Sequence, residues 1–310
     1  MGWRVIDDAR LDLPEFEAGS VWLAGAGPGE PGLLSVLALH ALGNADSVVY
    51  DALVDRRILD LARPGALRHY AGKRGGRPSS SQPDISAQLV RLAREGHRVL
   101  RLKGGDPCVF GRGAEEALAL VAAGIPFRIV PGITAGIGGL AYAGIPLTHR
   151  DTNSAVTFVT GHNSDGGVPD GLDWNAIARA APVIVLYMAL KHLPNIVSRL
   201  IAGGRRPDEP AAVVGKATTD AQRVLVSSLG ELPAAAHAIE APAIVVVGDV
   251  VRLRAGLDWR GARSGRRLDP DPLGRRERRD PAWGAVAAVS AATRPSTGDF
   301  ASLESYKRRS

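Results

Sequence analysis

Short apolar runs alternate with helical patterns from Val21 to about Pro146. The runs that predict strands are VWLAG (21–25), SVVYD (47–51), RVLRLKGG (98–105) and FRIVPG (127–132). The segments with helical spacing are LLSVLALHALGNA (33–45), DISAQLVRLAREG (84–96) and GAEEALALVAAG (113–124). Such alternation is typical of βαβ units and predicts a parallel sheet. We expect Gly43, Gly96 and Gly124 to end the three helices as C-cap glycines.

The second half of the chain is richer in strands. Strands are predicted at AVTFVTGH (155–162), PVIVLYMAL (182–190), AAVVGKA (211–217), QRVLVSS (222–228) and AIVVVGDV (243–250). Helices are predicted at DWNAIARAA (173–181), LKHLPNIVSRLIAGG (190–204) and LGELPAAAHA (229–238). A short polar turn separates the strands of Val213 and Val224, which implies some antiparallel pairing.

The pattern as a whole predicts an α/β protein of two domains. We expect an N-terminal extension at 1–20, an α/β domain with a parallel sheet at 21–148, and an α/β domain with a mixed sheet at 149–259. Residues 260–310 lack an apolar period and are rich in Arg, Pro and Gly, so they predict a basic, disordered tail.

Composition favours a globular protein of the cytoplasm. The 310 residues are 45% hydrophobic and 23% charged, and no apolar run approaches the roughly 18 residues that a membrane span needs. The N-terminal segment has no apolar core, so we expect no signal peptide. Cys108 is the only cysteine, which excludes an intrachain disulfide and suits a reducing compartment. We interpret Cys108 as a small apolar filler.

The net charge of +6 does not by itself predict an acidic partner. Residues 261–310 hold 11 Lys and Arg against 6 Asp and Glu, whereas residues 1–260 hold 27 against 26. The body of the chain is therefore nearly neutral, and we do not expect nucleic acid as a partner.

The motif AGAGPGEPG (24–32) follows a predicted strand, which is the position of a dinucleotide-binding fingerprint. Glu30 stands where the third glycine should be, and Pro28 lacks the N–H that a phosphate-binding turn uses. A dinucleotide is therefore disfavoured.

The motif KGGDP (103–107) follows another predicted strand. In a P-loop the lysine follows the glycines, but Lys103 precedes them. We expect Asp106 to be aimed at the ligand, where an acid suits a cation or a hydroxyl and opposes phosphate. Both motifs together predict a ligand without phosphate.

The chain resembles the tetrapyrrole methylase family over roughly Val21 to Trp259. The segments that carry the resemblance are VWLAGAGPGEPGLLSVLALHALGNADSVVYDALV, GKRGG, RLKGGDPCVFGRGAEEALALVAAGIPFRIVPGITA, YAGIPLTHR, VTFVTGH and LYMALKHLPNI. The resemblance implies the class III methyltransferase fold, in which two α/β domains enclose a cleft that binds S-adenosyl-L-methionine (SAM). It also implies a homodimer and S-adenosyl-L-homocysteine (SAH) as a product.

SAM has no phosphate and carries a sulfonium cation, so it agrees with the ligand predicted from the two motifs. The cofactor contacts implied by the resemblance are Pro28, Gly104, Gly105, Asp106, Val109, Thr134, Ala135, Met188 and Ala217. Ala217 stands where relatives often have glycine, so a backbone contact is implied there.

The resemblance further implies methylation of uroporphyrinogen III at C2 and C7, through precorrin-1 to precorrin-2, in siroheme or cobalamin biosynthesis. Asp51 matches a proton acceptor and Lys73 a proton donor, while Arg112, Glu115 and Arg150 match further functional positions. Arginines suit a substrate with eight carboxylates because they bind carboxylate in a bidentate manner.

No metal is expected, because neither His149 nor His162 has a second His or Cys at ligand spacing. Three alternatives stay open. Another precorrin or an RNA could be the methyl acceptor in the same fold, and an NAD-dependent dehydrogenase would have to bind its nucleotide through GAGPGE (25–30).

Overall fold

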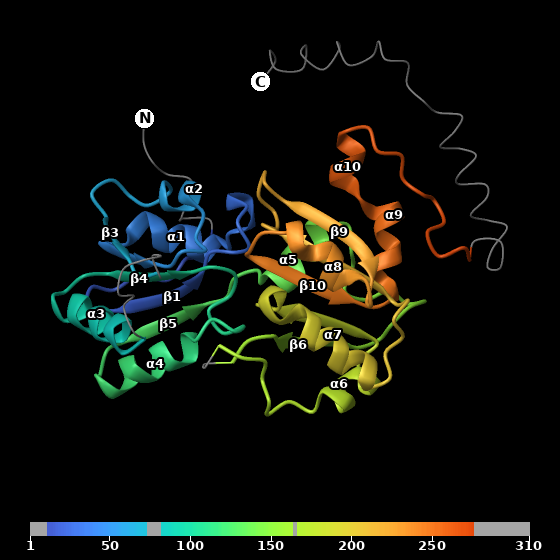
Figure 1. Ribbon diagram of the computed structural model, residues 1–310. Helices are drawn as coiled ribbons and strands as arrows, with labels where there is room; N and C mark the ends of the chain where they lie inside the picture. Colours follow the sequence, from blue (N-terminus) through green and yellow to red (C-terminus); the bar gives the residue numbers. More distant parts are fainter. Residues whose placement is uncertain (1–10, 73–81, 164–165, 276–310) are drawn as a thin grey trace, which may run out of the picture. The chain divides into compact units, whose positions relative to one another are not determined.

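The computed structural model describes residues 11–72, 82–163 and 166–275. Two five-stranded sheets lie within one compact unit that ends at Leu268 (Figure 1). The first sheet has the order β3 (Leu67–Tyr70), β2 (Ser47–Tyr50), β4 (Val99–Lys103), β1 (Val21–Gly25) and β5 (Phe127–Val130). The second has the order β6 (Val156–Thr160), β7 (Val183–Tyr187), β10 (Ala243–Val247), β8 (Pro210–Gly215) and β9 (Arg223–Ser228).

All strand pairs of the first sheet are parallel, as the alternating pattern predicts. The register sets Gly25 beside Lys103 and Tyr50 beside Leu102, so the carboxyl ends of three strands share one edge. In open α/β sheets this edge carries the ligand. The sequence pattern missed β3, because only two of its four residues are even half-buried and no apolar alternation marks it.

Helices cover both faces of the first sheet. On one face lie α1 (Val36–Asn44) and α2 (Arg56–Leu59), which pack on Trp22 and Leu100. On the other lie α3 (Gln82–Arg94) and α4 (Gly113–Ala122), which pack on Leu23 and Val99 (Figure 1). Burial of both faces explains the continuous apolar runs of the strands.

The predicted end of the first helix is wrong, whereas the other two are confirmed. Gly96 and Gly124 have φ of +84° and +68° just past the ends of α3 and α4, a conformation that glycine adopts without strain. Gly43 lies inside α1, which continues to Asn44 and is followed by extended Ala45.

The second sheet is mixed, also as predicted. β6 and β7 are parallel, while β10 pairs antiparallel with β7 and β8, and β9 pairs antiparallel with β8. One face packs on α6 (Trp174–Ala180), α7 (Leu193–Ala202) and α8 (Leu232–Ala235). The described residues also form short 3-10 helices: η2 (Pro31–Leu33), η3 (Leu190–His192), η4 (Ala236–Ala238) and η5 (Asp249–Leu253).

The other face of the second sheet packs on α5 (Ala135–Tyr142), which precedes the predicted domain boundary. Leu140 of α5 shares a core with Val185 and Val246. The helix therefore belongs to the second sheet by packing, and the limits at 148 and 149 stay a prediction.

The chain after the second sheet folds further than its pattern indicates. It forms α9 (Arg254–Leu257) and α10 (Trp259–Arg263), so the first residues of the predicted disordered tail are helical. Trp259 Nε1 donates to the carbonyl of Ala141 at 3.1 Å, and Arg266 pairs with buried Asp258 at 2.7 Å. Individual polar contacts hold this segment, which explains why an apolar period did not reveal it.

Candidate functional site

A cleft of about 690 Å³ opens at the carboxyl edge of the first sheet, and residues of the second sheet form its other wall. All nine residues to which the resemblance assigns cofactor contacts line it: Pro28, Gly104, Gly105, Asp106, Val109, Thr134, Ala135, Met188 and Ala217. Five chain segments far apart in the sequence thus meet in one place, although the binding role of each residue stays a prediction.

Three glycines let the backbone cross at the floor of the cleft. A Cβ on Gly25 would lie 2.4 Å from the carbonyl oxygen of Gly105, and a Cβ on Gly132 would lie 2.3 Å from the same atom. Gly105 has φ +69° and exchanges two backbone hydrogen bonds with Gly27. Only glycine allows this approach, which joins β1, the loop after β4 and the loop after β5.

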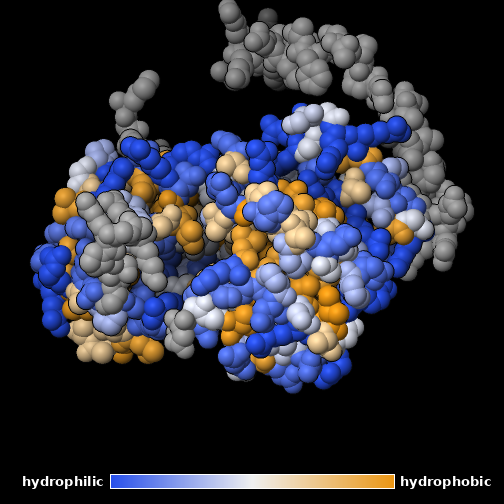
Figure 2. All heavy atoms as spheres, in the orientation of Figure 1, coloured by the Kyte–Doolittle hydropathy of each residue, from blue (hydrophilic) through white to orange (hydrophobic). Residues whose placement is uncertain are grey.

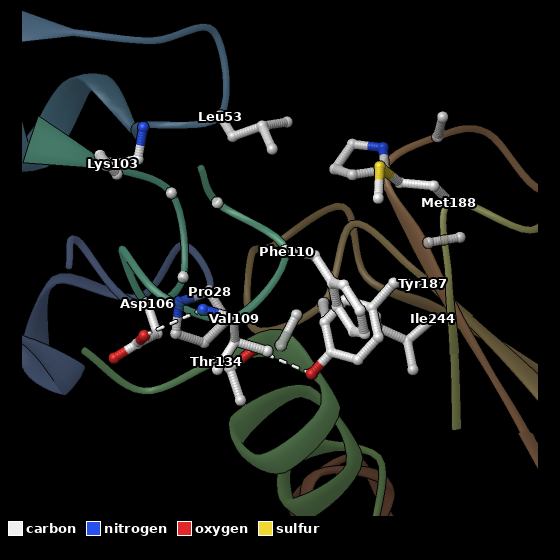
Figure 3. A pocket seen from close by; sticks show the side chains of 18 of the residues that line it. Pro28, Leu53, Lys103, Asp106, Val109, Phe110, Thr134, Tyr187, Met188 and Ile244 are labelled. Atoms are coloured by element: carbon white, nitrogen blue, oxygen red, sulfur yellow. Dashed lines mark hydrogen bonds between the residues drawn. The ribbon is translucent and has the colours of Figure 1, made fainter. Parts of the chain in front are cut away.

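The Asp106 carboxylate shapes the loop after β4. Its Oδ1 accepts hydrogen bonds from the amides of Val109 at 3.2 Å (Figure 3) and Cys108 at 2.7 Å. Its Oδ2 accepts one from the Gly132 amide at 2.9 Å. The expectation that Asp106 is aimed at the ligand is therefore incomplete, because both oxygens already bind backbone amides.

Tyr187 joins the second sheet to the first turn of α5. Its hydroxyl lies 2.8 Å from Thr134 Oγ1 and accepts a hydrogen bond from the Gly136 amide at 2.9 Å. Burial raises the pKa of Tyr187 above its usual value. Phe110 packs on this ring with centroids 4.9 Å apart, so two aromatic side chains form part of the wall (Figure 3).

The turn after β1 has no free helix amide to offer a phosphate. The Glu30 carboxylate accepts a hydrogen bond from the Gly32 amide at 3.2 Å, and the Glu30 amide itself donates to Thr218 Oγ1 at 3.0 Å. A dinucleotide phosphate at this turn would lie next to the Glu30 carboxylate, and the Glu30 N–H is already bonded to Thr218. The structure thus supports the sequence argument against a dinucleotide.

Asp51 lies at the carboxyl end of β2 and lines the cleft. Its Oδ1 accepts from the Leu53 amide at 2.9 Å, and its Oδ2 accepts from the Gly104 amide at 3.4 Å. These bonds fix a carboxylate beside the loop that carries the predicted cofactor contacts. A carboxylate held there can accept a proton from a bound ligand.

The other predicted catalytic residues are not all at the cleft. Arg112 lines it and pairs with Glu115, which is not part of the lining. The hydrogen bond from Arg112 holds the pKa of Glu115 below its usual value, although both side chains are more than half exposed. Arg150 is exposed and outside the lining, and Lys73 lies outside the described residues.

Several lining residues were not predicted from the sequence. Tyr187, Phe110 and Lys191 line the cleft, although no contact was assigned to them within the motifs that contain them. Tyr187 comes directly before Met188 at the carboxyl end of β7, and that position was the one available signal.

Several residues other than glycine, at or next to the cleft, have a left-handed backbone conformation. Phe110, Arg112 and Met188 have φ of +52°, +58° and +53°, and Lys216 and Thr218, on either side of Ala217, have +45° and +67°. Left-handed backbone outside glycine is strained and gathers at functional sites.

Two further interpretations concern cysteine and histidine. Cys108 is exposed, so its interpretation as a small apolar filler is wrong. His149 Nδ1 accepts the Asp151 amide at 3.2 Å, and the His162 ring lies 6.3 Å from that of His192. Within the described ranges, no group of three or more His, Cys, Asp or Glu is placed to hold a metal ion, and no helix is long and apolar enough to cross a membrane.

Comparison with known sequences identifies close relatives. Residues 20–233 match the family described as Tetrapyrrole (Corrin/Porphyrin) Methylases. A uroporphyrinogen-III C-methyltransferase of Sinorhizobium sp. is 62% identical over 280 residues, which cover 90% of this chain and 100% of the relative. A siroheme synthase of Gluconacetobacter diazotrophicus is 53% identical over 76% of this chain, and the chain spans 50% of that longer protein.

Solved structures agree with the sequence relatives. A uroporphyrin-III C-methyltransferase from Thermus thermophilus, in complex with S-adenosyl homocysteine, superimposes with a TM-score of 0.66 at 40% identity over 76% of this chain and 99% of that chain. A cobalt precorrin-4 methyltransferase gives 0.68 at 26% identity over 77% and 98%. The fold, the gathered motifs and these relatives show that the chain belongs to the tetrapyrrole (corrin/porphyrin) methylase family.

Proposed function

We propose that this protein is a SAM-dependent methyltransferase that converts uroporphyrinogen III to precorrin-2 by methylation at C2 and C7. The observation that carries the proposal is the single cleft that gathers all nine motif residues. The 62% identity to a uroporphyrinogen-III C-methyltransferase, matched over its whole length, supports the same substrate.

The residues of the cleft fit SAM. Its volume of about 690 Å³ falls within the range of sites for drug-sized ligands. Gly104 leaves room where a Cβ would lie 2.5 Å from the Cβ of Leu53, and Val109 and Met188 offer apolar contact. The turn at Glu30 does not favour phosphate, and SAM has none.

When bound, SAM supplies a methyl group on a sulfonium that is already a good leaving group. The main task of the protein is therefore to align the two reactants. After attack by a pyrrole carbon, the ring carries positive charge until it loses a proton. Asp51, fixed by two backbone amides, is the proposed acceptor of that proton.

The substrate needs cations near the cleft because it carries eight carboxylates. Arg112 lines the first wall and Lys191 the second, so positive charge stands on both sides. We also assign Lys73, Glu115 and Arg150 to the substrate side of the site by family resemblance.

We further propose a homodimer in the cytoplasm. Leu118 and Val121 of α4 are 69% and 59% exposed, and the edge strand β5 exposes Phe127 and Ile129. Apolar spheres gather over the region of α4 in Figure 2. Contiguous exposed apolar surface is typical of protein interfaces. The free thiol of Cys108 suits a reducing compartment.

One experiment tests the activity. The purified chain is incubated without oxygen with methyl-labelled SAM and uroporphyrinogen III, and the label in the tetrapyrrole is measured. Two methyl groups per tetrapyrrole are expected. Label in a precorrin supplied in parallel, with none in uroporphyrinogen III, would favour the precorrin alternative; no transfer by folded protein that binds SAH would contradict the proposal.

A further inference from the structure

The segment that follows the second sheet lies against the loop that carries Ala217. This loop, between β8 and β9, covers residues 216–222, and Ala217 in it lines the cleft. Arg260, the first residue of the predicted disordered tail, lies in α10 and donates hydrogen bonds to the loop. Neither the family match, which ends at residue 233, nor the proposed function gives α10 a role.

The Arg260 guanidinium contacts the loop at two acceptors. Its Nη1 and Nη2 donate to the Thr219 carbonyl at 3.4 and 3.3 Å, and Nη1 also donates to Gln222 Oε1 at 3.2 Å. The guanidinium carbon lies 5.7 Å from the centroid of the Tyr142 ring, a distance at which a cation and an aromatic ring attract each other. Arg260 therefore joins the loop to the end of α5.

Gln222 connects Arg260 to the part of the loop that reaches the cleft. Its Oε1 accepts the Thr218 amide at 2.7 Å as well as Arg260, and its Nε2 donates to the Tyr142 carbonyl at 3.1 Å. Because Thr218 follows Ala217 directly, this series of hydrogen bonds ends beside the wall of the cleft.

The backbone of the loop has a conformation that needs such support. Lys216 and Thr218 have φ of +45° and +67°, a region in which residues other than glycine are strained. Strained backbone persists only where the surrounding contacts determine it. Thr218 is 2% exposed, and its amide donates to Gln222. Loss of the contacts from Arg260 should therefore let the loop leave this conformation.

The same loop meets the first sheet at the turn after β1. Thr218 Oγ1 accepts the Glu30 amide at 3.0 Å, and Pro28, two residues before Glu30, lines the cleft. A Cβ on Gly29 would lie 3.2 Å from Thr218 Oγ1 and 3.3 Å from the Ala217 carbonyl oxygen. A shift of the loop would thus disturb two predicted cofactor contacts, Pro28 and Ala217, which come from different sheets.

We propose that Arg260 is a positioning residue for the cofactor: it holds Thr219 and Gln222 so that the left-handed loop keeps Ala217 on the wall of the cleft. Arg260 does not itself line the cleft, so it acts through the loop. The inference rests on the SAM-binding part of the proposed function and adds a residue to it.

The test is the Kd of SAH, measured by calorimetry, together with the KM for SAM and the KM for uroporphyrinogen III. Arg260→Met should raise the Kd of SAH and the KM for SAM about tenfold, the equivalent of about 1.4 kcal/mol, because hydrogen bonds of a charged group contribute on that order. The KM for uroporphyrinogen III should stay close to the wild-type value, since the cations at the cleft are unchanged. A general loosening of the fold would raise both KM values.

Arg263→Met is the matched control. Arg263 also lies in α10, and its exposed side chain makes no hydrogen bond or ion pair with the residues that the structure describes. This variant should leave the Kd of SAH unchanged. Arg260→Lys keeps a charge but loses the planar pair of donors, so it should weaken SAH binding less than Arg260→Met does. If Arg260→Met does not fold, Arg260→Lys supplies the comparison with the wild type.

A double variant tests whether Arg260 acts through Gln222. Gln222→Leu combined with Arg260→Met should bind SAH about as weakly as Gln222→Leu alone, because residues in one hydrogen-bond network are not additive. Losses that multiply would overturn the inference. So would an unchanged Kd of SAH in both Arg260 variants beside a lower urea midpoint, since α10 would then only stabilise the fold. Wild-type protein that binds SAH without methylating uroporphyrinogen III would contradict the proposed activity alone.

Discussion

The hydroxyl of Tyr187, at the end of β7, lies 2.8 Å from the hydroxyl of Thr134, at the start of α5, and both side chains are buried. The contact fixes the loop after β5 to the second sheet, on the wall of the cleft. Tyr187 also accepts the Gly136 amide, so one phenol completes two hydrogen bonds.

Tyr187→Phe should therefore destabilise the protein and weaken binding at the cleft. The variant leaves the Gly136 amide and the Thr134 hydroxyl without a partner, at a cost of about 1–3 kcal/mol. Urea denaturation measures the stability, and calorimetry measures SAH affinity, which should also fall. Tyr142→Phe is the control, since no hydrogen bond of its hydroxyl is seen among the described residues; equal losses in both variants would contradict the prediction.

Gly132→Ala should prevent normal folding of the cleft floor. The added Cβ would lie 2.3 Å from Gly105 O and 2.6 Å from Gly25 Cα, both backbone atoms that cannot move aside. We expect a loss above about 3 kcal/mol, measured as a shift of the urea midpoint. Gly43→Ala is the opposite case: it lies inside α1 with nothing within 4 Å, and should stabilise by about 0.5–1 kcal/mol. Similar urea midpoints for Gly132→Ala and Gly43→Ala would contradict the close approach of the backbone segments at Gly132.

Asp46 should contribute stability that depends on pH. Burial acts to raise its pKa, but the hydrogen bonds and charge of Arg98, with the charge of Arg63, outweigh it and hold the pKa below the usual 3.8. A lowered pKa means that the contribution is present above about pH 4 and is lost as the pH falls through the folded value.

Asp46→Asn should therefore lower the free energy of unfolding by about 1–2 kcal/mol at pH 7, and by less below pH 4. Urea titrations between pH 7 and 3 measure the difference. Asp60→Asn, which breaks an ion pair with Arg68 whose side chains are both more than 40% exposed, should have little effect at any pH. If the free energies of unfolding of the wild-type protein and Asp46→Asn differ by the same amount at every pH, the prediction is wrong.

Arg112→Gln should raise the KM for the tetrapyrrole about tenfold, equivalent to about 1.4 kcal/mol, and leave SAH affinity unchanged. The reason is that Gln removes the planar charge that binds a carboxylate at the wall of the cleft. Arg199→Gln, on α7 and outside the cleft lining, is the control. Loss of SAH affinity in Arg112→Gln would mean that the residue acts on the cofactor side.

Nine of the ten strands were predictable from the sequence because apolar runs indicate burial, whereas the half-exposed edge strand β3 was missed. The contacts between residues near the cleft were harder to predict from the sequence pattern. Glycines at 25, 105 and 132 meet only after three strands are paired, so a linear pattern does not show which of them touch. Lys103 and Glu116 are 13 residues apart, and their ion pair forms because α4 folds back over β4.

The positions that family resemblance assigns to the cofactor all line the cleft, whereas not all of those that it assigns to the substrate do. The nine cofactor positions converge on one cleft because their motifs lie at strand ends that the fold brings together. Glu115 and Arg150 match motif positions, yet one faces Arg112 and the other is exposed away from the lining. Tyr187 was missed because a buried aromatic at a strand end is also ordinary core.

Phe110, Arg112 and Met188 have left-handed backbone conformations and line the cleft. At these positions, greater thermal stability and catalytic activity therefore call for different residues. Glycine would relieve about 1 kcal/mol of backbone strain at each position, and it would remove the side chain that the cleft presents. Selection for heat resistance would thus favour glycine at these three positions, and we expect those substitutions to weaken turnover. Improvements in shelf life that preserve activity should be sought elsewhere, at places such as Gly43, where the backbone is regular and nothing lies nearby.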